Sequence, residues 1–523
     1  MRRYRNALLG LIAVQLLGYL LVWFVMHWPM GAGRAPMSSE HPVSTGLYDA
    51  TASYRDWFMG LPAVDRLLAA RLTHRLMLAA GLGLASAGYL GALWVLARSM
   101  LQRSTSRILA ATVLIALPLL LMPQLMSSDV WSYAIYGRIA AVHGGNPFVD
   151  LPSAYPADPF FNRLYWKETA SVYGPAWVLV SAALIPIAGL CGSGAFVTLM
   201  TFKLFLFLCH LASVALIGLA LRRLKPARAT LGMAMYAWNP LVLFEFAGNA
   251  HNDAFMLVLI LAGIALATMG RPLGVVAAMM LAGLAKLTGL LGLPAYTLYV
   301  ARTSSRPIAT MMLHVVVAAI LSAALYLPFW HGAGTFHGAA AAPNFYILHR
   351  SPAAVVSGTL EGWFSHERQV NQWIETPPPD SRTAKIRTGV RRGSLLLLLI
   401  VCAVATLWPI RSIDGWIERM IYIFAAYILF GALYFNPWYG TWLIPFAALS
   451  PRYAGVLIGT SLFLLIFYLP INLDGRLGQL VIWPWPLLLL PLCRRGPWRS
   501  RAVAPDAALQ PVVAADAATA ESL

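Results

Sequence analysis

Charged residues are scarce in this chain. Only 11% of its 523 residues are Asp, Glu, Lys or Arg, whereas a soluble domain carries about a quarter. That scarcity excludes an ordinary soluble globular protein, and the short alternating segments typical of a membrane β-barrel are missing as well. Hydrophobic residues make up 59% of the chain, and apolar runs of about 18–25 residues recur along it. The sequence therefore predicts an all-α polytopic membrane protein.

Cysteine is also rare, and its placement excludes two further classes. The four cysteines lie in or beside apolar runs, with neither the spacing of metal ligands nor that of a disulfide framework. No cofactor is predicted, although the sequence leaves a divalent metal open. The formal charge of +18 comes mostly from Lys and Arg in short loops. This pattern favours topology signals over a nucleic-acid partner.

Apolar runs and loop charges together predict the topology. Arg2, Arg3 and Arg5 precede the first run, which we interpret as a retained helix because it is longer than the apolar part of a signal peptide. Four arginines from Arg494 to Arg501 follow the last run, so both termini are expected inside. About fourteen crossings are expected, at about 7–27, 77–97, 106–124, 195–221, 229–246, 253–269, twice within 273–301, and at 308–328, 394–410, 416–434, 439–450, 453–471 and 478–493.

One apolar segment, 174–191, is not counted as a crossing. If it crossed, the basic run 222–228 would lie outside, against the positive-inside tendency. The segment opens with Gly174-Pro175 and ends among glycines. We therefore expect a helix that lies along the outer surface or re-enters the membrane.

The chain divides into four expected units. Residues 1–103 hold two additional N-terminal helices with an outer loop, and residues 104–301 form a core with outer loop 125–194. Residues 302–493 hold the C-terminal helices and the long outer loop 331–393. Residues 494–523 are predicted to be a disordered cytoplasmic tail, because they carry too little apolar surface to pack.

Lys286 is the single charge in the apolar run 273–301. Since basic loops flank this run on both sides, the chain has to turn back at Lys286, which predicts two short helices of about 21 Å each. The turn would then lie within the depth of the membrane, in a cavity lined by protein. Two interpretations of Lys286 are open, a phosphate contact or a lysine whose ammonium snorkels to the interface.

Asp129 lies where the chain leaves the membrane after the apolar run 108–125. A carboxylate at such a place is costly and indicates a function. Asp129 can act as a general base if its surroundings tune its pKa. The alternative is a helix cap, because Ser127, Ser128 and Asp129 suit the start of a helix over 130–141.

Further polar and aromatic residues map to the same side as Asp129 by charge counting. The segment 251–253 is either a hydrogen-bonding cluster or a cap for the helix that follows, and the aromatic pair 438–439 either stacks on a sugar or belongs to the interfacial aromatic belt. The basic end of loop 331–393 is either a lipid head-group contact or a solvated charge run. Convergence of polar groups in an apolar bundle predicts a site, with these candidates: Asp129, Tyr133, Arg138, Asn146, Tyr173, His251, Asn252, Asp253, Lys286, Trp438 and Tyr439.

Several short motifs in this order resemble the C-type (GT-C) glycosyltransferase superfamily. They are Ser128-Asp129-Val130-Trp131-Ser132-Tyr133, Gly137-Arg138, Gly145-Asn146-Pro147-Phe148, Tyr173-Gly174-Pro175, the segment Gly248 to Asp253, Lys286-Leu287-Thr288 and Pro437-Trp438-Tyr439. Within the superfamily, the chain is most similar to the polyprenol-phosphomannose-dependent α-mannosyltransferases, over residues 104–450. In many members the catalytic loop follows the first helix, whereas here it follows the third.

The resemblance implies a GT-C-like fold with a large first outer loop that carries the catalytic residue. It also implies transfer of a sugar, most simply mannose, from a polyprenyl-phosphate donor to a hydroxyl of a lipid-linked, glycan or protein acceptor, with inversion. Asp129 would be the base, Lys286 and Arg138 would hold the phosphate, and the remaining candidates would contact the donor. The site would face the outside of a bacterial inner membrane, and a metal is not needed in many members. The competing classes are a transporter or flippase and a ligase that moves a preassembled glycan.

Overall fold

The computed structural model describes residues 2–27, 71–99, 104–122, 127–192, 194–340, 347–365 and 377–469. The expected helix 478–493, the expected tail and most of the first expected loop lie outside these residues. Within them the regular structure is helical, and β-pairing is limited to two isolated bridges. The predicted all-α class is therefore confirmed for the described part of the chain.

Five of the described helices are long and apolar enough to cross a membrane. They are α1 (Arg2–His27), α5 (Arg71–Ser99), α9 (Ala195–Leu224), α15 (Pro307–Tyr326) and α18 (Arg382–Leu407). A sixth candidate is a helix pair, 240–248 and 253–268, that is bent by 119° at its break. The chain is thus a multi-pass membrane protein, while the count of fourteen crossings and the orientation of the termini stay predictions.

The remaining described helices are shorter. They are α6 (Thr105–Leu120), α7 (Asp129–Ala141), α8 (Pro175–Leu190), α10 (Ala229–Ala237), α11 (Pro240–Leu243), α12 (Asp253–Ala267), α13 (Pro272–Ala285), α14 (Leu293–Thr303), α16 (His337–Ala340), α17 (Pro352–Phe364), α19 (Ile413–Ala426), α20 (Ile444–Leu449) and α21 (Ala454–Leu464). At 16 residues, α8 is about 24 Å long and shorter than a typical span.

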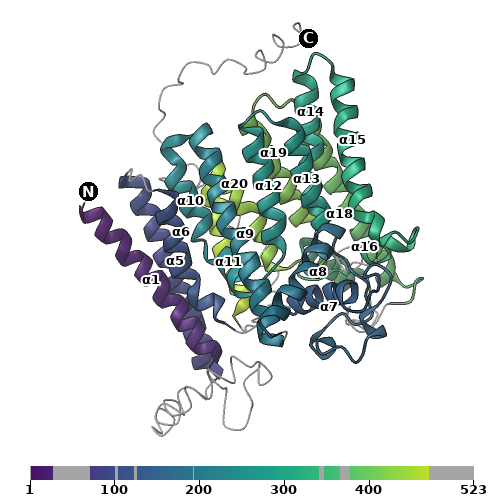
Figure 1. The fold of residues 1–523 in the computed structure, drawn as a ribbon, viewed down its shortest axis with the longest axis horizontal. Coiled ribbons are helices and arrows are strands. Elements are labelled where there is room, and N and C mark those ends of the chain that lie inside the picture. The colour runs from purple at the N-terminus through teal and green to yellow at the C-terminus, as the bar shows by residue number, and fades with distance from the viewer. Residues whose placement is uncertain are drawn as a thin grey trace.

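The helices form a bundle with two distinct ends (Figure 1). Helices α7, α8 and α16 gather at one end, which we name the loop end, and the junction between α14 and α15 lies at the other. Basic residues of different loops meet at that other end, in the contacts Arg222 to Thr105, Lys225 to Asp414, and Arg302 to the carbonyl of Leu407. The charge pattern therefore grouped these loops correctly on one side.

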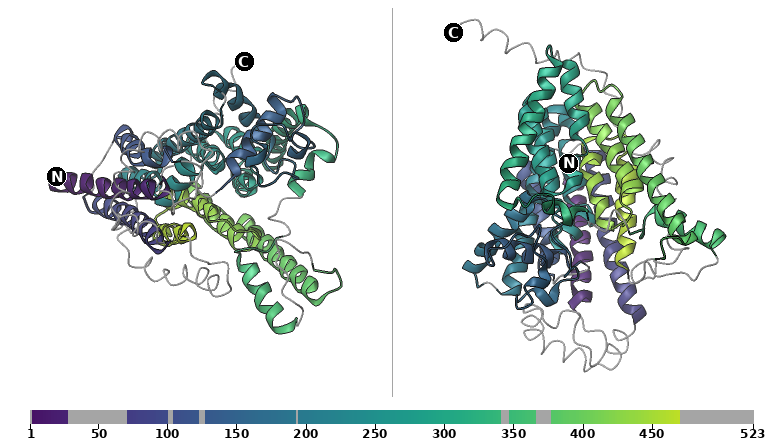
Figure 2. Two further views of the ribbon diagram at one scale, coloured as in Figure 1. Left: turned by 90° about the horizontal axis from the view of Figure 1, so that it is seen from below. Right: turned by 90° about the vertical axis from the view of Figure 1, so that its right-hand side faces the viewer.

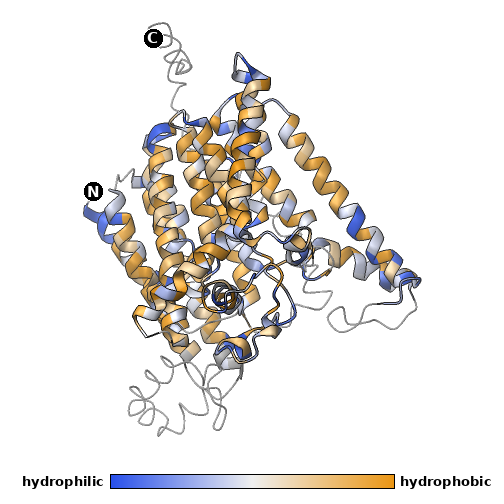
Figure 3. Ribbon diagram, turned by 45° about the vertical axis from the view of Figure 1, so that its right-hand side comes forward, coloured by the Kyte–Doolittle hydropathy of each residue, from blue (hydrophilic) through white to orange (hydrophobic). Residues whose placement is uncertain are grey.

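The prediction of one long loop over 331–393 is wrong in part. Helix α17 lies within it, and α18 begins at Arg382 where Ser381 accepts a hydrogen bond from the amide of Ala384. Arg387 of this helix is paired with Glu361 of α17 at 3.1 Å, so a tertiary contact neutralises part of the charge of the basic run. Figure 2 shows α17 and α18 projecting from the body of the bundle. Figure 3 shows hydrophilic residues near one end of α18, which is otherwise apolar.

The expected helix 229–246 is also wrong as a single element. Helix α10 stops at Ala237, α11 starts after Asn239, and a π-helical turn, η4 (Phe244–Gly248), follows. Asn239 causes the restart, because its side-chain oxygen accepts hydrogen bonds from the amides of Leu241 and Val242 while Pro240 occupies the first helical position. The broken helix delivers η4 to the interior near the loop end.

The first two long helices support this break. Gln15 of α1 donates a hydrogen bond of 2.6 Å to the carbonyl of Trp238, and Tyr89 of α5 donates one of 2.7 Å to the carbonyl of Met235. Both carbonyls belong to the end of α10, where a helix leaves its last carbonyls without partners. Helices α1 and α5 therefore stabilise the break after α10, because their side chains donate hydrogen bonds to its unpaired backbone carbonyls.

We expect Tyr89→Phe to destabilise the protein by about 0.6–1.7 kcal/mol, the range measured for hydrogen bonds between membrane helices. The reason is that the buried carbonyl of Met235 loses its donor. Ser86→Ala is the matched control on α5, since the Ser86 hydroxyl bonds only the carbonyl of Leu82 in its own helix. Thermal unfolding in detergent measures both variants. Equal melting temperatures for the two would show that the contact contributes nothing.

Lys203 of α9 donates hydrogen bonds to backbone carbonyls at the C-terminal end of α6. Its ammonium is fully buried and donates to the carbonyls of Leu119 and Met122, at 3.0 and 2.6 Å. A cation is favourable at a helix C-terminus, where unpaired carbonyls concentrate negative charge. The contact joins α9 to the end of α6, just before the segment that carries Asp129.

Candidate functional site

The turn at Lys286 is as predicted. Helix α13 ends at Ala285, a 3-10 turn η5 (Leu287–Leu290) follows, and α14 starts at Leu293. The Lys286 ammonium lies 2.8 Å from Oδ1 of Asp253 and also lies 5.5 and 5.4 Å from the ring centres of Tyr439 and Trp442. The carboxylate of Asp253 and the faces of the two aromatic rings together hold the ammonium in place.

Asp129 is the first residue of α7, which confirms the predicted helix after the membrane exit. The amide of Asp129 donates to Oγ of Ser127 at 3.2 Å, and Ser128 occupies the N-cap position without a side-chain cap bond. The Asp129 side chain remains 23% exposed. A carboxylate in the first turn suits the positive end of the helix dipole, and the partial exposure leaves its oxygens accessible from the adjoining cavity.

A cavity of about 140 Å³ brings the separate predictions together. It is lined by Asp129, Ser132, Tyr136, Trp166, Thr169, Val172, Tyr173, Lys286, Tyr434, Asn436, Trp438 and Tyr439. The shared side of the membrane that charge counting predicted is thus a shared pocket for Asp129, Tyr173, Lys286, Trp438 and Tyr439. We name it the Asp129 cavity.

Close backbone packing closes one wall of this cavity. The amide of Gly174 donates to the carbonyl of Ala285 at 3.1 Å, directly before Lys286. A Cβ at position 174 would collide with the carbonyl of Leu284, so only glycine permits this approach. The contact places Tyr173, the preceding residue, beside Lys286 in the cavity wall.

The segment between η4 and α12 lies behind the cavity. Ala250 has a positive φ of 59°, which an L-residue adopts at a cost of roughly 1–2 kcal/mol. This conformation accompanies the sharp bend of 119° between the two helical pieces. Strain of this kind is common at functional sites, where the surrounding structure has to maintain it. The bend turns His251 toward Asp129.

His251 lies between two carboxylates. Its Nδ1 is 3.7 Å from Oδ2 of Asp129, and its Nε2 is 3.2 Å from Oε2 of Glu245, although neither approach has hydrogen-bond geometry. The ring stacks on Trp438 at a centroid distance of 4.2 Å. His251 is fully buried, so it supports Asp129 and Trp438 from behind and does not line the cavity, in contrast to the predicted donor contact.

Asp253 and Asn252 are buried in the same layer. Oδ1 of Asp253 accepts hydrogen bonds from Lys286 and from Nε1 of Trp442, at 2.8 and 2.5 Å. Oδ2 of Asp253 and the side-chain nitrogen Nδ2 of Asn252 are buried without a hydrogen-bond partner in the described part of the structure. Their predicted contact with the donor is not direct, because Lys286 stands between Asp253 and the cavity.

Tyr133 is a structural residue. Its hydroxyl donates to Oδ1 of Asn252 and accepts from the amide of the same residue, each at 3.3 Å. Its ring packs edge-on against Tyr173 and Trp177, with centroids 5.0 and 5.1 Å away. The side chain is 1% exposed and does not line the cavity, so it ties α7 to the 251–253 segment.

Arg138 lies away from the Asp129 cavity. Its Nε donates to Oδ2 of Asp158 at 2.7 Å, and His143 reaches the same oxygen at 2.8 Å. Burial opposes ionisation of Asp158, but hydrogen bonds from His143, the Phe160 amide and Arg138 hold the pKa of this carboxyl below its usual value. The guanidinium therefore stabilises the loop after α7 and does not line the Asp129 cavity, and its contact with the donor phosphate stays a prediction.

Asn146 also has a structural role instead of the predicted donor contact. Its side chain donates to the carbonyl of Phe329 at 2.8 Å and accepts from the amide of Phe148 at 3.1 Å. The first bond joins the loop after α7 to the turn that follows α15, and the second lies within the loop. Short polar side chains commonly bond nearby backbone in this way.

Among the residues around the site that sequence reasoning missed, two contact the predicted residues from behind the cavity. Glu245 is fully buried, next to His251, and accepts hydrogen bonds from Asn249 and Tyr468. An acid inside an apolar segment is a functional signal, so Glu245 was detectable in the sequence. Trp442 gave no comparable signal, because its indole N–H finds Asp253 only in the folded chain.

No group of three or more His, Cys, Asp or Glu among the described residues could hold a metal ion. The acidic groups behind Asp129 have other partners, since Asp253 accepts from Lys286 and Trp442, and Glu245 accepts from Asn249 and Tyr468. That the protein needs no cofactor stays a prediction from the sequence.

The comparisons with known proteins agree with this geometry. Residues 47–302 match the family model described as "Alpha-(1->6)-mannopyranosyltransferase, N-terminal domain". Together with the helical membrane bundle, this match confirms the predicted resemblance and supports a mannosyltransferase-like membrane protein of the C type.

One characterised relative is alpha-(1->6)-mannopyranosyltransferase A of Mycobacterium tuberculosis (strain ATCC 25618 / H37Rv). The two chains are 24% identical over 395 residues, which make up 68% of each. The similarity supports a glycosyltransferase and leaves the donor, the acceptor and the residue roles of this chain to be proposed.

Proposed function

We propose that the protein transfers mannose from a polyprenyl-phosphate donor to a hydroxyl of a glycan or lipid-linked acceptor, with Asp129 as the general base. One observation supports this most directly. A carboxylate and an ammonium from separate parts of the chain, Asp129 and Lys286, line one cavity together with Trp438 and Tyr439. Acid, cation and aromatic rings in one pocket suit a hydroxyl nucleophile, a phosphate and a sugar ring.

The proposed chemistry is a single displacement. The acceptor oxygen forms a bond to the anomeric carbon while the bond from that carbon to the phosphate oxygen breaks and its electron pair stays on the phosphate. The proton of the acceptor hydroxyl passes to the carboxylate of Asp129, which afterwards releases it to water. Attack opposite the leaving group inverts the anomeric carbon, so an α-linked product of the kind in the relative's name requires a β-linked donor.

Lys286 is the proposed contact of the phosphate. Its ammonium is held by Asp253, so an incoming phosphate meets a cation that is already oriented. Negative charge increases on the phosphate as it leaves, and a fixed cation stabilises that change without reorganising. Trp438 and Tyr439 are the proposed stacking surfaces for the sugar.

The proposed location is the inner membrane of a bacterium, with the loop end facing outside. Two considerations support it. The basic loops meet at the opposite end of the bundle, and basic loops prefer the cytoplasmic side. A polyprenyl donor is itself a membrane lipid, which suits a cavity next to the turn of α13 and α14.

Purified full-length protein incubated separately with polyprenyl-phosphate-mannose, -glucose and -arabinose tests this function. With a mannoside acceptor present, we expect loss of the mannosyl donor and formation of a longer mannoside, detected by mass spectrometry. The other two donors should be consumed far more slowly. Movement of the donor across a vesicle membrane without its consumption would contradict the proposal and favour a transporter.

A further inference from the structure

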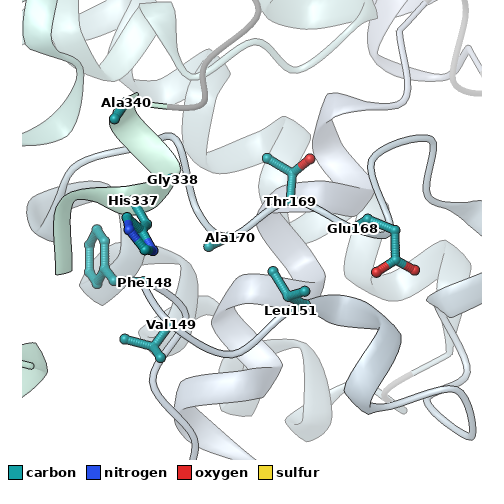
Figure 4. Close-up of a pocket in the computed structure, with 9 residues that line it drawn as sticks. All are labelled: Phe148, Val149, Leu151, Glu168, Thr169, Ala170, His337, Gly338 and Ala340. Carbon is teal, nitrogen blue, oxygen red and sulfur yellow. The ribbon is translucent and has the colours of Figure 1, made fainter. Parts of the chain in front are cut away.

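A second cavity lies next to the Asp129 cavity at the loop end (Figure 4). Its volume is about 440 Å³, which falls within the range of roughly 300–1,000 Å³ for small-molecule sites. The two cavities share Thr169 as a lining residue. The Thr169 carbonyl accepts a hydrogen bond of 2.7 Å from Tyr136, which itself lines the Asp129 cavity. Thr169 therefore separates two adjoining spaces.

The second cavity is built by segments that are far apart in the chain. Phe148 is 3% exposed and packs on Tyr326 and Phe329 of the α15 end, at centroid distances of 5.8 and 5.3 Å. On another side, α16 approaches the 170–171 segment so closely that a Cβ at Gly338 would collide with the carbonyl of Ser171. These contacts hold the cavity open in a defined shape.

The lining combines apolar surface with three polar side chains, Glu168, Thr169 and His337. Figure 4 shows Phe148 and His337 on one side, Glu168 on the other, and Leu151 between them. Sugars present C–H faces, which pack on aromatic and aliphatic surfaces, and hydroxyl groups at their edges. A carboxylate accepts from such hydroxyls, and an imidazole donates or accepts. Glu168 is already oriented by a hydrogen bond of 2.7 Å from Ser153.

We propose that this second cavity is a carbohydrate subsite, which binds the sugar unit of the acceptor next to the one that receives the new residue. The proposal rests on the proposed function for the identity of the neighbouring reaction. A glycan chain that passes Thr169 places one unit against Asp129 and the following unit between Phe148, Glu168 and His337. A prenyl chain fits less well, because three polar side chains line the space and the segments that form it belong to the loop end.

The test compares two alanines of the same short helix. Ala340 lines the second cavity and Ala339 does not, although both are exposed. The probes are an octyl α-1,6-linked mannobioside and the octyl monomannoside, each added to the full-length protein in detergent. Binding is measured by saturation-transfer NMR, and transfer by the KM for each acceptor.

In Ala340→Trp, the indole fills the cavity. We expect its Kd and KM for the mannobioside to rise at least tenfold, while the KM for the monomannoside stays within twofold of wild type. Ala339→Trp should behave as wild type with both probes. As a second and milder variant, His337→Ala should raise the Kd for the mannobioside by about 2–10-fold, the effect of one lost hydrogen bond.

The outcomes separate this proposal from the proposed function. Mannobioside binding that depends on Ala340, without any transfer by the wild type, would support the subsite and contradict the proposed function. A wild type that does not bind the mannobioside, or an Ala340→Trp variant that binds it as well as Ala339→Trp, would overturn the subsite. Displacement of the bound mannobioside by geranyl phosphate from the second cavity would identify a prenyl site and would also overturn it.

Discussion

Asp129→Asn is expected to lower the rate of sugar transfer by about 10²–10⁴-fold, the usual contribution of a general base. The amide has nearly the shape of the carboxylate but cannot accept the proton of the acceptor hydroxyl. The side chain lies at the start of α7 and is partly exposed in its cavity, so the substitution leaves helix and cavity walls in place. Single-turnover assays with a radiolabelled mannosyl donor measure the rate, and equilibrium binding of the same donor should change little.

Asp150→Asn is the matched control for this variant. Asp150 also lies at the loop end, does not line the Asp129 cavity, and accepts hydrogen bonds from the amide of Asn146 and the hydroxyl of Tyr155. An asparagine oxygen can accept the same bonds, so transfer should stay near wild type. If Asp129→Asn kept wild-type turnover, Asp129 would not be the base, and its position would reflect only the start of the helix.

Lys286→Met is expected to weaken donor binding and to destabilise the protein at the same time. Asp253 is fully buried, and loss of its cation leaves an uncompensated charge. Removing one partner of a buried ion pair typically costs about 3–5 kcal/mol. A loss of activity in this variant alone would therefore not distinguish phosphate binding from unfolding.

The double variant Lys286→Met/Asp253→Asn separates the two effects. Asparagine is neutral and its oxygen can still accept from Trp442, so most of the lost stability should return. If Lys286 contacts the donor phosphate, the Kd for the donor stays raised by about 10–100-fold in the double variant, the effect of a lost hydrogen bond to a charged group. Recovery of wild-type donor affinity together with stability would assign Lys286 a purely structural role.

A second lysine–aspartate pair is the control for charge removal itself. Lys225 lies 2.7 Å from Asp414 at the opposite end of the bundle, and both side chains are partly exposed. Exposed pairs contribute about 0–1 kcal/mol. Lys225→Met should therefore change stability little and leave the affinity for the donor unchanged, as titrations with the same donor in the same detergent would show.

The sequence predicted helix positions well where the bounds of one apolar run determine where the helices begin and end. The turn at Lys286 followed from one charge in a long apolar run and from basic residues on both sides, and α13 and α14 form on either side of it. The break after Ala237 was missed because the run looked continuous. Its cause is local, an Asn-Pro pair that caps a new helix, but its stability depends on Gln15 and Tyr89 from two distant helices.

The candidate site was predicted in part for a similar reason. Loop charge indicates the side of the membrane and not the depth of a residue, so it could not separate the layer that lines the cavity from the layer behind it. Lys286 and Trp438 line the space, while Asp253 and His251 lie behind them. Arg138 was assigned to a phosphate because nothing in the sequence indicates that Asp158 takes its charge.

The sequence by itself determined that this is a helical membrane protein, that its basic loops lie together, and that Asp129 and Lys286 belong to the same side. These properties depend on hydrophobicity, chain length and charge, which are local and additive along the chain. The tertiary structure decided which of the polar residues meet. The pairing of Lys286 with Asp253, the layer of His251 behind Asp129, and the second cavity beyond Thr169 all come from contacts between segments 30 or more residues apart in the sequence. Such contacts depend on the packing of whole helices, which no single stretch of sequence encodes.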